Sequence, residues 1–376
     1  MTDQLHLIDA PAWPGPVGDI LAGPRRVRWL FELVDAHRNR FIRAIDGMFD
    51  CELEWNLARA VRGGGSVSYQ GEPVDWMTHR LRIHYEVTAP DGRSMRWTLG
   101  TFQVASPEQE HTPLTRETVR LELYDMTWRL EVQRTTAAAW TVPKGSNYVE
   151  WARHIMDRQS IKHSLEDSDK VSRAARSWPP GTPYKDVVND LMDSAGMFSV
   201  WADPQGIIRS SKYVRPESRG IRYRFQDTRD GMPYGRSFTH RRDTFDVPNE
   251  VILVNVPPTS DDPNVPPPPP LVGEARDTTS QFSWAKRGVI ISHLLEQQEY
   301  PDQASITAAA ARKLQDMQQV KSAMDIRHMI VPLAVNDVTG FTNTEASLGL
   351  RAVVEKHTAS QKTGLSDTRI REVLNA

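Results

Sequence analysis

The first third of the chain is dominated by alternation of apolar and polar residues. In RRVRWLFEL (25–33) one face carries Val27, Trp29, Phe31 and Leu33 and the other carries Arg26, Arg28 and Glu32, and HRLRIHYEV (79–87) repeats the period. A period of two places apolar side chains on one face of a strand, so both segments predict half-buried antiparallel strands. The turn residues at 90–92 predict a hairpin to the strand that follows.

That next strand, WTLGTFQV (97–104), changes phase in its middle. Its apolar residues are odd-numbered at Trp97 and Leu99 and even-numbered at Phe102 and Val104. The slip falls at Gly100. We expect a bulge there or at the next residue, with the two pairs of apolar side chains facing different layers.

A second change of phase follows in VRLELYDMTWRLEV (119–132), near Tyr124 and Asp125. The alternation predicts strand in both halves of this segment. Two slips in neighbouring strands favour a β-barrel, because bulges and glycine bends turn strands around corners. The alternative is that each slip is a short loop between two strands.

The middle of the chain takes on helical spacing. Asn147 precedes an amphipathic stretch, 148–157, and has the spacing of a capping box with Glu150. Thr182 is the expected N-cap of a second helix that ends before Gly196. The residues FSVWADPQGIIRSS (198–211) then predict a hairpin with a type I turn at 203–206.

The last third returns to strands. The apolar run 250–256 predicts a central strand buried on both faces, and 257–273 predicts a Pro-rich surface loop. The segment 283–295 predicts another strand. Asp302 is the expected cap of a helix over 304–320, after which short strands reach the end of the chain.

Composition narrows the class of protein. The chain has 376 residues, a net charge of -2 and one cysteine, Cys51. The balance of charge argues against a general nucleic-acid binder, and a single cysteine excludes an internal disulfide. No apolar run is long enough for a membrane span and the N-terminus lacks a secretory pattern, so we expect a soluble protein that folds in the cytoplasm.

No catalytic, cofactor-binding or metal-binding constellation stands out. No two of the eleven histidines are two or four residues apart, which excludes the usual zinc spacings. The triple glycine 63–65 lacks the Lys-Ser/Thr of a phosphate loop and is interpreted as a flexible loop tip. We therefore predict no enzyme and no cofactor. Arginines on the strand faces fit either solvated surfaces or inter-subunit pairing, and both interpretations stay open.

The order of these motifs resembles the central hub protein of bacteriophage tail tips. That family covers the baseplate hubs of contractile tails and the N-terminal hub region of tail-associated lysins. The resemblance spans nearly the whole chain and rests on short motifs: WTLGTFQV, TVRLELYDMTWRL, TPYKDVVNDLMDSAG, ADPQGIIR, DVPNEVILVN and the closing segment that ends in Arg371-Glu372-Val373.

The resemblance implies a fold and a function. It implies a mainly β chain with an α+β insertion: two tail-tube-like β-barrel domains, at 1–135 and 236–376, and a helix-containing region at 136–235. Three such chains would form a homotrimeric, pseudo-sixfold ring in the virion. The ring would join the tail tube to the distal tip and fibre proteins and let DNA pass transiently through a polar lumen.

Two other functions are weighed against the hub. One is a tail-associated cell-wall hydrolase, which would need an acid pair or a zinc triad. The other is a receptor-binding or carbohydrate-binding tail protein, with Trp13, Trp76 or Trp178 stacking on sugars. Because the chain ends soon after its last strand, we expect other tip proteins to supply lysis and adhesion.

Overall fold

The computed structural model describes residues 20–21, 23–110, 118–136, 140–172, 175–228, 232, 234–235, 237–241, 245–255, 270–297, 303–318 and 322–373. The chain divides into two compact units. Unit 1 comprises Met1–Thr239 with Met324–Asn375, and unit 2 comprises His240–Ala323. The range 236–376, expected to form one domain, thus contains a compact unit of its own.

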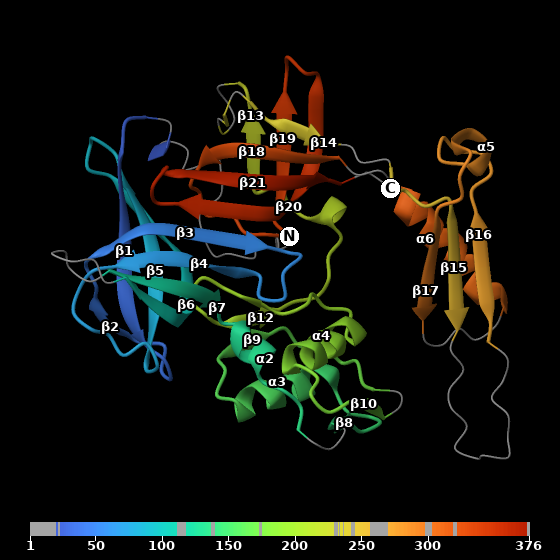
Figure 1. Cartoon of the computed structure of the whole chain (residues 1–376), viewed down its shortest axis with the longest axis horizontal. Helices are drawn as coiled ribbons and strands as arrows, with labels where there is room; N and C mark the ends of the chain where they lie inside the picture. The colour runs from blue at the N-terminus through green and yellow to red at the C-terminus, as the bar shows by residue number, and fades with distance from the viewer. Residues whose placement is uncertain are drawn as a thin grey trace. The chain divides into compact units, whose positions relative to one another are not determined.

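Seven strands of unit 1 form the first part of a long sheet (Figure 1). Their order is β3-β4-β7-β6-β5-β1-β2, and every pair is antiparallel. The strands are β1 (Arg26–Asp35), β2 (Phe41–Ala44), β3 (Met48–Asn56), β4 (Gly63–Tyr69), β5 (His79–Thr88), β6 (Ser94–Glu110) and β7 (Thr118–Asp125).

The connection between β2 and β3 forces this sheet to curl. These two strands lie at opposite ends of the seven, yet only the residues from Ala44 to Met48 connect them. Such a connection spans at most about 15 Å, whereas seven flat strands would be about 29 Å wide. The sheet therefore bends until its ends approach each other, which gives it the shape of a barrel.

The expected bulge in β6 is confirmed. Ile83 pairs with Gly100 and the next residue, His84, pairs with Thr98. Leu99 is therefore the extra residue on β6. The hairpin from β5 to β6 is also confirmed, with its turn at the predicted position.

The expectation that the bulge sends side chains to different layers is wrong. Tyr85 lies opposite Trp97, and Leu81 lies opposite Phe102, so both halves of β6 face the same side of the sheet. All four apolar residues of β6 named above are buried in one core. One extra residue shifts the pleat by one position, so the sequence must change phase to keep its apolar side chains on the same face.

The second change of phase marks the start of a helix, and the predicted strand over 126–132 is wrong. The Asp125 carboxylate accepts hydrogen bonds from the N–H and hydroxyl of Thr127, at 2.8 and 2.5 Å. These bonds end β7, and α2 (Trp128–Val132) follows. Met126 and Leu130, four residues apart, are buried, whereas Val132 is 45% exposed.

The elements from α2 to β12 form a helical insertion with its own core (Figure 1). Besides α2 they are β8 (Trp140–Val142), α3 (Tyr148–Arg158), β9 (His163–Leu165), β10 (Arg176–Trp178), α4 (Tyr184–Ser194), β11 (Trp201–Ala202) and β12 (Ile208–Ser210). A short 3-10 helix, η1 (Pro216–Ser218), follows. Apolar side chains of α3 and α4 face each other in this core, as their spacing predicts.

Of the two predicted helix caps that lie within the described residues, one is confirmed. The Asn147 side chain accepts hydrogen bonds from the backbone of Val149 and Glu150, at 2.9 and 3.1 Å. The cap position of α4 is Pro183 instead of Thr182. The Thr182 hydroxyl donates to a preceding carbonyl, so it does not cap the helix.

A second barrel completes unit 1. It contains β13 (Tyr223–Gln226), β18 (Ala323–Met329), β19 (Val338–Asn343), β20 (Leu348–Ser360) and β21 (Leu365–Glu372), with β14 (Thr239–Arg241) at the sequence boundary between the units. β13 pairs with β19, β19 with β20, β20 with β21, and β21 with β18. Met232 bridges to Phe225 of β13, and Tyr234 bridges to His328 of β18, which closes the ring.

The long strand β20 joins the two barrels. Its first half, from Leu348 to Val353, pairs with β19 of the second barrel. Its last part, from Lys356 to Ser360, pairs with β3 of the first sheet. One continuous sheet therefore runs through both, and the mainly β fold with a helical part is confirmed.

Unit 2 is a three-stranded sheet covered by a helix on one face. The strands are β15 (Glu250–Asn255), β16 (Val272–Arg276) and β17 (Ser292–Gln297), with β15 in the centre, and the helices are α5 (Trp284–Arg287) and α6 (Gln303–Gln318). Val251 and Leu253 are buried against α6. A Cβ on Gly273 would lie 2.5 Å from the carbonyl oxygen of Ile306, so glycine permits this close approach.

Two expectations for unit 2 are corrected. β15 is central, but it is not buried on both faces, since Ile252 and Val254 are only half-buried. The predicted strand over 283–295 begins only at Ser292, because α5 occupies 284–287 and ends at Gly288 in the left-handed conformation.

Some predictions lie outside the described residues: the Pro-rich segment up to residue 269, the cap at Asp302 and Trp13. None of the helices that the structure describes is long and apolar enough to cross a membrane.

Candidate functional site

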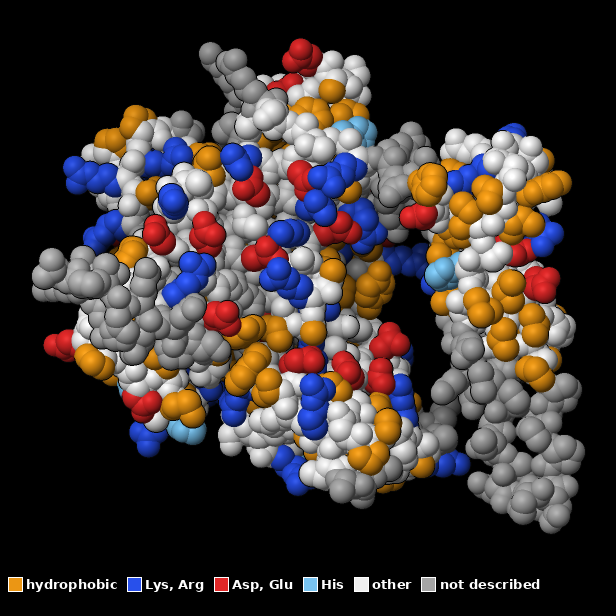
Figure 2. All heavy atoms as spheres, viewed as in Figure 1, with side chains coloured by type: hydrophobic (Ala, Val, Ile, Leu, Met, Phe, Trp, Pro, Cys, Tyr) orange, Lys and Arg blue, Asp and Glu red, His pale blue; other side chains and the backbone are white. Residues whose placement is uncertain are grey.

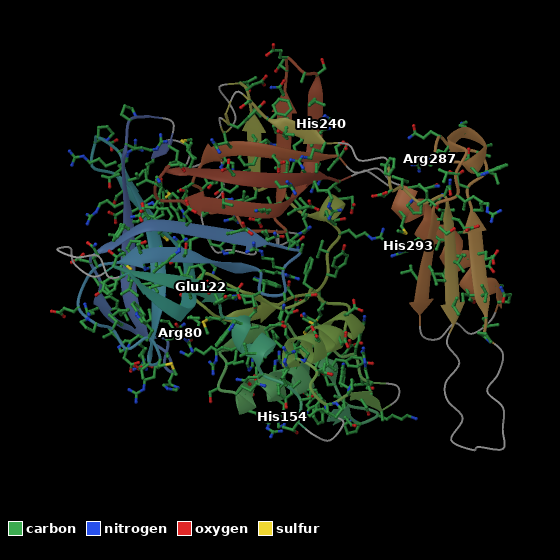
Figure 3. The ribbon with its side chains drawn as sticks, in the orientation of Figure 1. Arg80, Glu122, His154, His240, Arg287 and His293 are labelled. Carbon is green, nitrogen blue, oxygen red and sulfur yellow. The ribbon has the colours of Figure 1, made fainter. Side chains whose placement is uncertain are left out.

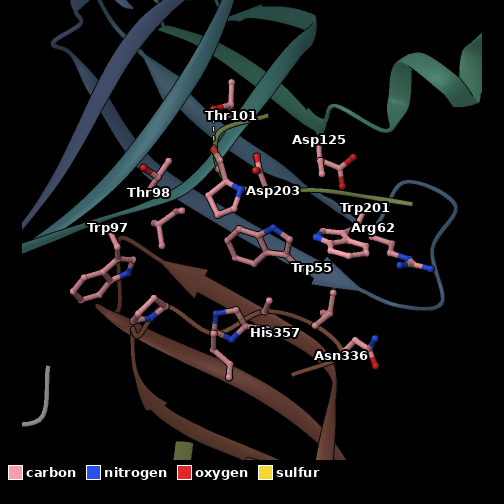
Figure 4. Close-up of a pocket in the computed structure, with 18 of the residues that line it drawn as sticks. Trp55, Arg62, Trp97, Thr98, Thr101, Asp125, Trp201, Asp203, Asn336 and His357 are labelled. Atoms are coloured by element: carbon pink, nitrogen blue, oxygen red, sulfur yellow. Dashed lines mark hydrogen bonds between the residues drawn. The ribbon is translucent and has the colours of Figure 1, made fainter. Parts of the chain in front are cut away.

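A cavity of about 70 Å³ lies where the first sheet, the helical insertion and the second barrel meet (Figure 4). We call it the junction cavity. Its walls come from β3, β6, β20, the turn after β11 and the loop before β19. The lining residues are Trp55, Arg62, 97–102, Asp125, 198–199, 201–204, 331–336 and His357.

The bulge in β6 holds one wall of the junction cavity. The Thr101 hydroxyl donates to the carbonyl of Pro204, at 2.9 Å, and accepts from Nε of Arg82, at 3.0 Å. A Cβ on Gly206 would lie 3.1 Å from Cβ of Thr101, so the turn at 203–206 packs directly on the bulge. The predicted turn is confirmed by the bond from Gly206 N–H to the carbonyl of Asp203. Thr101, two residues after the extra residue of the bulge, thus attaches the helical insertion to the sheet.

A buried carboxylate lies beside the junction cavity. Asp125 accepts hydrogen bonds from Thr127 and from the backbone N–H of Gly63, at 2.6 Å. Burial raises the pKa of this carboxyl, although the three hydrogen bonds favour its charged form. Burial lowers the pKa of Arg62, and the nearby Asp125 carboxylate opposes that shift.

The triple glycine lies in this region, and its interpretation as a loop tip is wrong. Gly63 to Gly65 begin strand β4. A Cβ on Gly63 would lie 2.8 Å from Trp55 and 2.9 Å from the Asp125 carboxylate, and one on Gly65 would lie 2.0 Å from a β3 carbonyl. These glycines therefore allow close packing of neighbouring strands instead of flexibility.

Two hydrogen-bond donors in the cavity wall have no partner among the described residues. The indole N–H groups of Trp97 and Trp201 are buried and unpaired. An unpaired buried donor costs about 1–3 kcal/mol, so this wall favours an acceptor.

A histidine pair connects the cavity to the interior of the second barrel. The Thr368 hydroxyl lies 2.8 Å from Nε2 of His328 and 2.9 Å from Nδ1 of His357. The ring of His357 also stacks on Trp55, with centroids 5.5 Å apart. Burial lowers the pKa of His328 to about 4 and that of His357 to about 3, so both rings are neutral near pH 7.

The hydrogen bonds determine which nitrogen carries the proton. Nδ1 of His328 lies 2.6 Å from the carbonyl of Met329, which can only accept, so this nitrogen is protonated. The Thr368 hydroxyl then donates to Nε2 of His328 and accepts from Nδ1–H of His357. Nε2 of His357 is left as a bare acceptor with no partner among the described residues.

The other candidate groups form no reactive cluster. No group of three His, Cys, Asp or Glu residues within the described ranges could hold a metal ion. Cys51 is fully buried in β3, and burial raises the pKa of its thiol. Figure 3 shows His154 at the surface of α3 and His293 on β17, on separate elements.

The strand arginines occupy varied environments. Arg28 pairs with Glu86 at 3.9 Å on the surface, whereas Arg222 is fully buried beside Asp337 at 3.7 Å. Arg80, labelled in Figure 3, is buried as well. The arginines are therefore not a uniformly solvated face, and inter-subunit pairing stays a prediction.

Exposed apolar side chains gather at two places. On β2, the edge strand of the first sheet, Phe41 is 57% exposed and Ile42 is 45% exposed. On the uncovered face of the unit 2 sheet, Leu294 lies beside Ile252, and Val272 lies beside Val254. Figure 2 shows apolar side chains gathered on unit 2. Exposed apolar patches commonly mark contact surfaces.

The junction cavity was not predicted. Its residues come from segments up to 302 positions apart, from Trp55 to His357, and no local motif connects them. The phase slips at Gly100 and near Asp125 and the predicted turn at 203–206 each pointed to part of a wall, but not to the cavity.

Neither a protein-family model nor a curated protein sequence matches this chain. Solved structures do match. The tail protein from Neisseria meningitidis MC58 has a TM-score of 0.62 at 12% identity, covering 92% of this chain and 96% of that one. The 43 kDa tail protein of prophage MuSo2 from Shewanella oneidensis has a TM-score of 0.60 at 11% identity, covering 92% and 98%.

A Francisella PdpA-VgrG complex also matches, with a TM-score of 0.52 at 8% identity, covering 92% of this chain and 58% of that one. At such low identities the similarity shows the fold alone. The expected resemblance to phage tail proteins is therefore confirmed at the level of the fold.

Proposed function

We propose that this chain is the structural hub of a phage tail tip. In this proposal three copies form a pseudo-sixfold ring that joins the tail tube to the distal tip and lets DNA pass. The observation that carries it is the pair of barrels joined through β20, because two barrels in each of three chains supply six similar units. The fold shared with phage tail proteins supports the same assignment.

The proposal divides the chain into parts with different tasks. The first barrel lies within 1–125, and the helical insertion extends from α2 to β12. The second barrel uses β13 and the strands from β18 onward, with unit 2 inserted before β18. The exposed apolar side chains of β2 and unit 2 suit contacts with neighbouring subunits or tail proteins, so the assembled protein would be found in the virion tail tip.

We infer a role without catalysis. The described residues hold no metal-binding group of three, and the carboxylate in the junction cavity is engaged by three hydrogen bonds. Zymography on cell-wall substrate tests this inference, because clear lysis by the purified protein would contradict it. Binding on a glycan array would instead favour a receptor-binding protein.

Electron-microscopic class averages of the purified protein test the ring directly. The proposal expects a threefold particle with an axial channel. Compact single subunits in every class, at concentrations where assembly is favoured, would contradict it.

A further inference from the structure

The uncovered face of the unit 2 sheet carries apolar side chains where water would favour polar ones. Helix α6 covers one face of this sheet, and the other face presents Ile252, Val254, Val272 and Leu294. Of these, Leu294 is 59% exposed and Val272 is 38% exposed. A sheet face in contact with water usually carries polar side chains, so this apolar group is suited to a protein contact.

An acidic side chain borders this apolar group. Glu274 lies opposite Ile252 in the sheet and two residues along β16 from Val272, so all three share the uncovered face. Glu274 is exposed, and it forms no salt bridge with any residue that the structure describes. We call the four apolar side chains together with Glu274 the open face.

The edge strand β2 has the opposite charge and a similar apolar character. Residues 37–44, HRNRFIRA, contain three arginines and no acidic residue, and we call this segment the basic edge. All four residues of β2 are exposed, and Phe41 and Arg43 share a face because they lie two residues apart. Within the described ranges, none of the three arginines forms a salt bridge.

The open face supplies what the basic edge lacks. An acidic partner would neutralise the arginines, and an apolar partner would cover Phe41 and Ile42. A nucleic-acid backbone would satisfy the arginines alone and leave the apolar side chains in water. The open face of a second copy offers both properties on one surface.

The two surfaces also match in spacing. Each has an apolar and a charged side chain two strand positions apart, about 7 Å: Phe41 and Arg43 on β2, and Val272 and Glu274 on β16. We propose that β2 of one copy packs on the open face of a neighbouring copy, with Phe41 over the apolar group and Arg43 beside Glu274. Such a contact joins two different surfaces of identical chains, so three of them can close a ring. The inference rests on the proposed trimeric hub and adds the contact that holds it together.

Charge reversal in the whole chain tests this contact. Arg43→Glu would place two carboxylates together, so the protein concentration at which half of the chains are assembled should rise about 10-fold. Glu274→Arg should have the same effect, and the double variant should return to within about 3-fold of the unmodified protein. Light scattering over a dilution series measures these concentrations. The control, Lys362→Glu, reverses an exposed lysine in the turn after β20 and should leave assembly unchanged.

Cysteine linking shows which chains are in contact. When one chain carrying Arg43→Cys and another carrying Glu274→Cys are produced together, oxidation should link them into a pair of chains. The native Cys51 should not take part, because it is fully buried.

Each opposite result has a distinct meaning. Trimers that survive both single charge reversals would overturn this contact and leave the ring intact, with both surfaces assigned to other tail proteins. Linking that occurs only within a chain carrying both cysteines would also overturn the contact, because β2 would then cover unit 2 of its own chain. An unmodified protein that stays monomeric at every concentration would contradict the ring and the contact together.

Discussion

The attachment of the helical insertion to the β6 bulge gives the sharpest prediction. Thr101 is 2% exposed, and its hydroxyl makes two hydrogen bonds, to the carbonyl of Pro204 and from Nε of Arg82. Thr101→Val keeps the shape and removes both bonds. A neutral bond contributes about 0.5–1.5 kcal/mol and one to a charged group about 1.5–3 kcal/mol. We therefore expect a loss of about 2–4.5 kcal/mol in the free energy of unfolding.

Urea unfolding followed by tryptophan fluorescence measures this loss. The matched control is Thr141→Val, whose hydroxyl bonds to Ser177 at 2.8 Å on the surface of the insertion. That variant should stay within about 0.5 kcal/mol of the unmodified protein. If Thr101→Val also leaves the free energy of unfolding unchanged, or if the control loses as much stability as Thr101→Val, the hydrogen bonds of Thr101 do not hold the insertion to the sheet.

Three further predictions concern other parts of the chain. Gly63→Ala, with its Cβ 2.8 Å from Trp55, should cost about 1–3 kcal/mol in urea unfolding, whereas Gly349→Ala, with open space around it, should be nearly neutral. Burial lowers the pKa of His328 from 6.5 to about 4, so its contribution to stability is full above pH 6.5 and falls as pH drops toward 4. His328→Gln should therefore remove about 2 kcal/mol of the stability difference between pH 7 and pH 5, and an unchanged pH profile would count against the buried neutral ring. Leu253→Ala should lower the free energy of unfolding of unit 2 by about 2–5 kcal/mol, because Leu253 is buried in that unit's own core. In calorimetry the melting temperature of unit 2 alone should fall. A lower melting temperature for unit 1 as well would contradict separate cores.

Most of the regular elements could be predicted, because burial imposes its period on the sequence. The alternation in β1 and β5 and the spacing in α3 and α4 follow from one apolar face each. The errors fall where a short pattern fits two structures. Met126 to Val132 alternates like a strand, yet the hydrogen bonds of Asp125 start a helix there.

The bulge shows a different limit. The phase slip at Gly100 correctly predicted an extra residue. The same slip, however, fits both a strand that turns toward a second layer and a bulge after which the apolar side chains stay on the same face. Only the pairing with β5 distinguishes the two. The junction cavity was beyond sequence reasoning, because Trp55, Trp97, Trp201 and His357 come together only through tertiary packing.

The most direct test of the central claim is the mass of the purified protein in solution, measured by multi-angle light scattering after size exclusion. One chain has a mass of 42.6 kDa, and the proposed hub requires three. We predict a particle of about 128 kDa. A stable 42.6 kDa monomer across the whole accessible concentration range would contradict the homotrimeric ring.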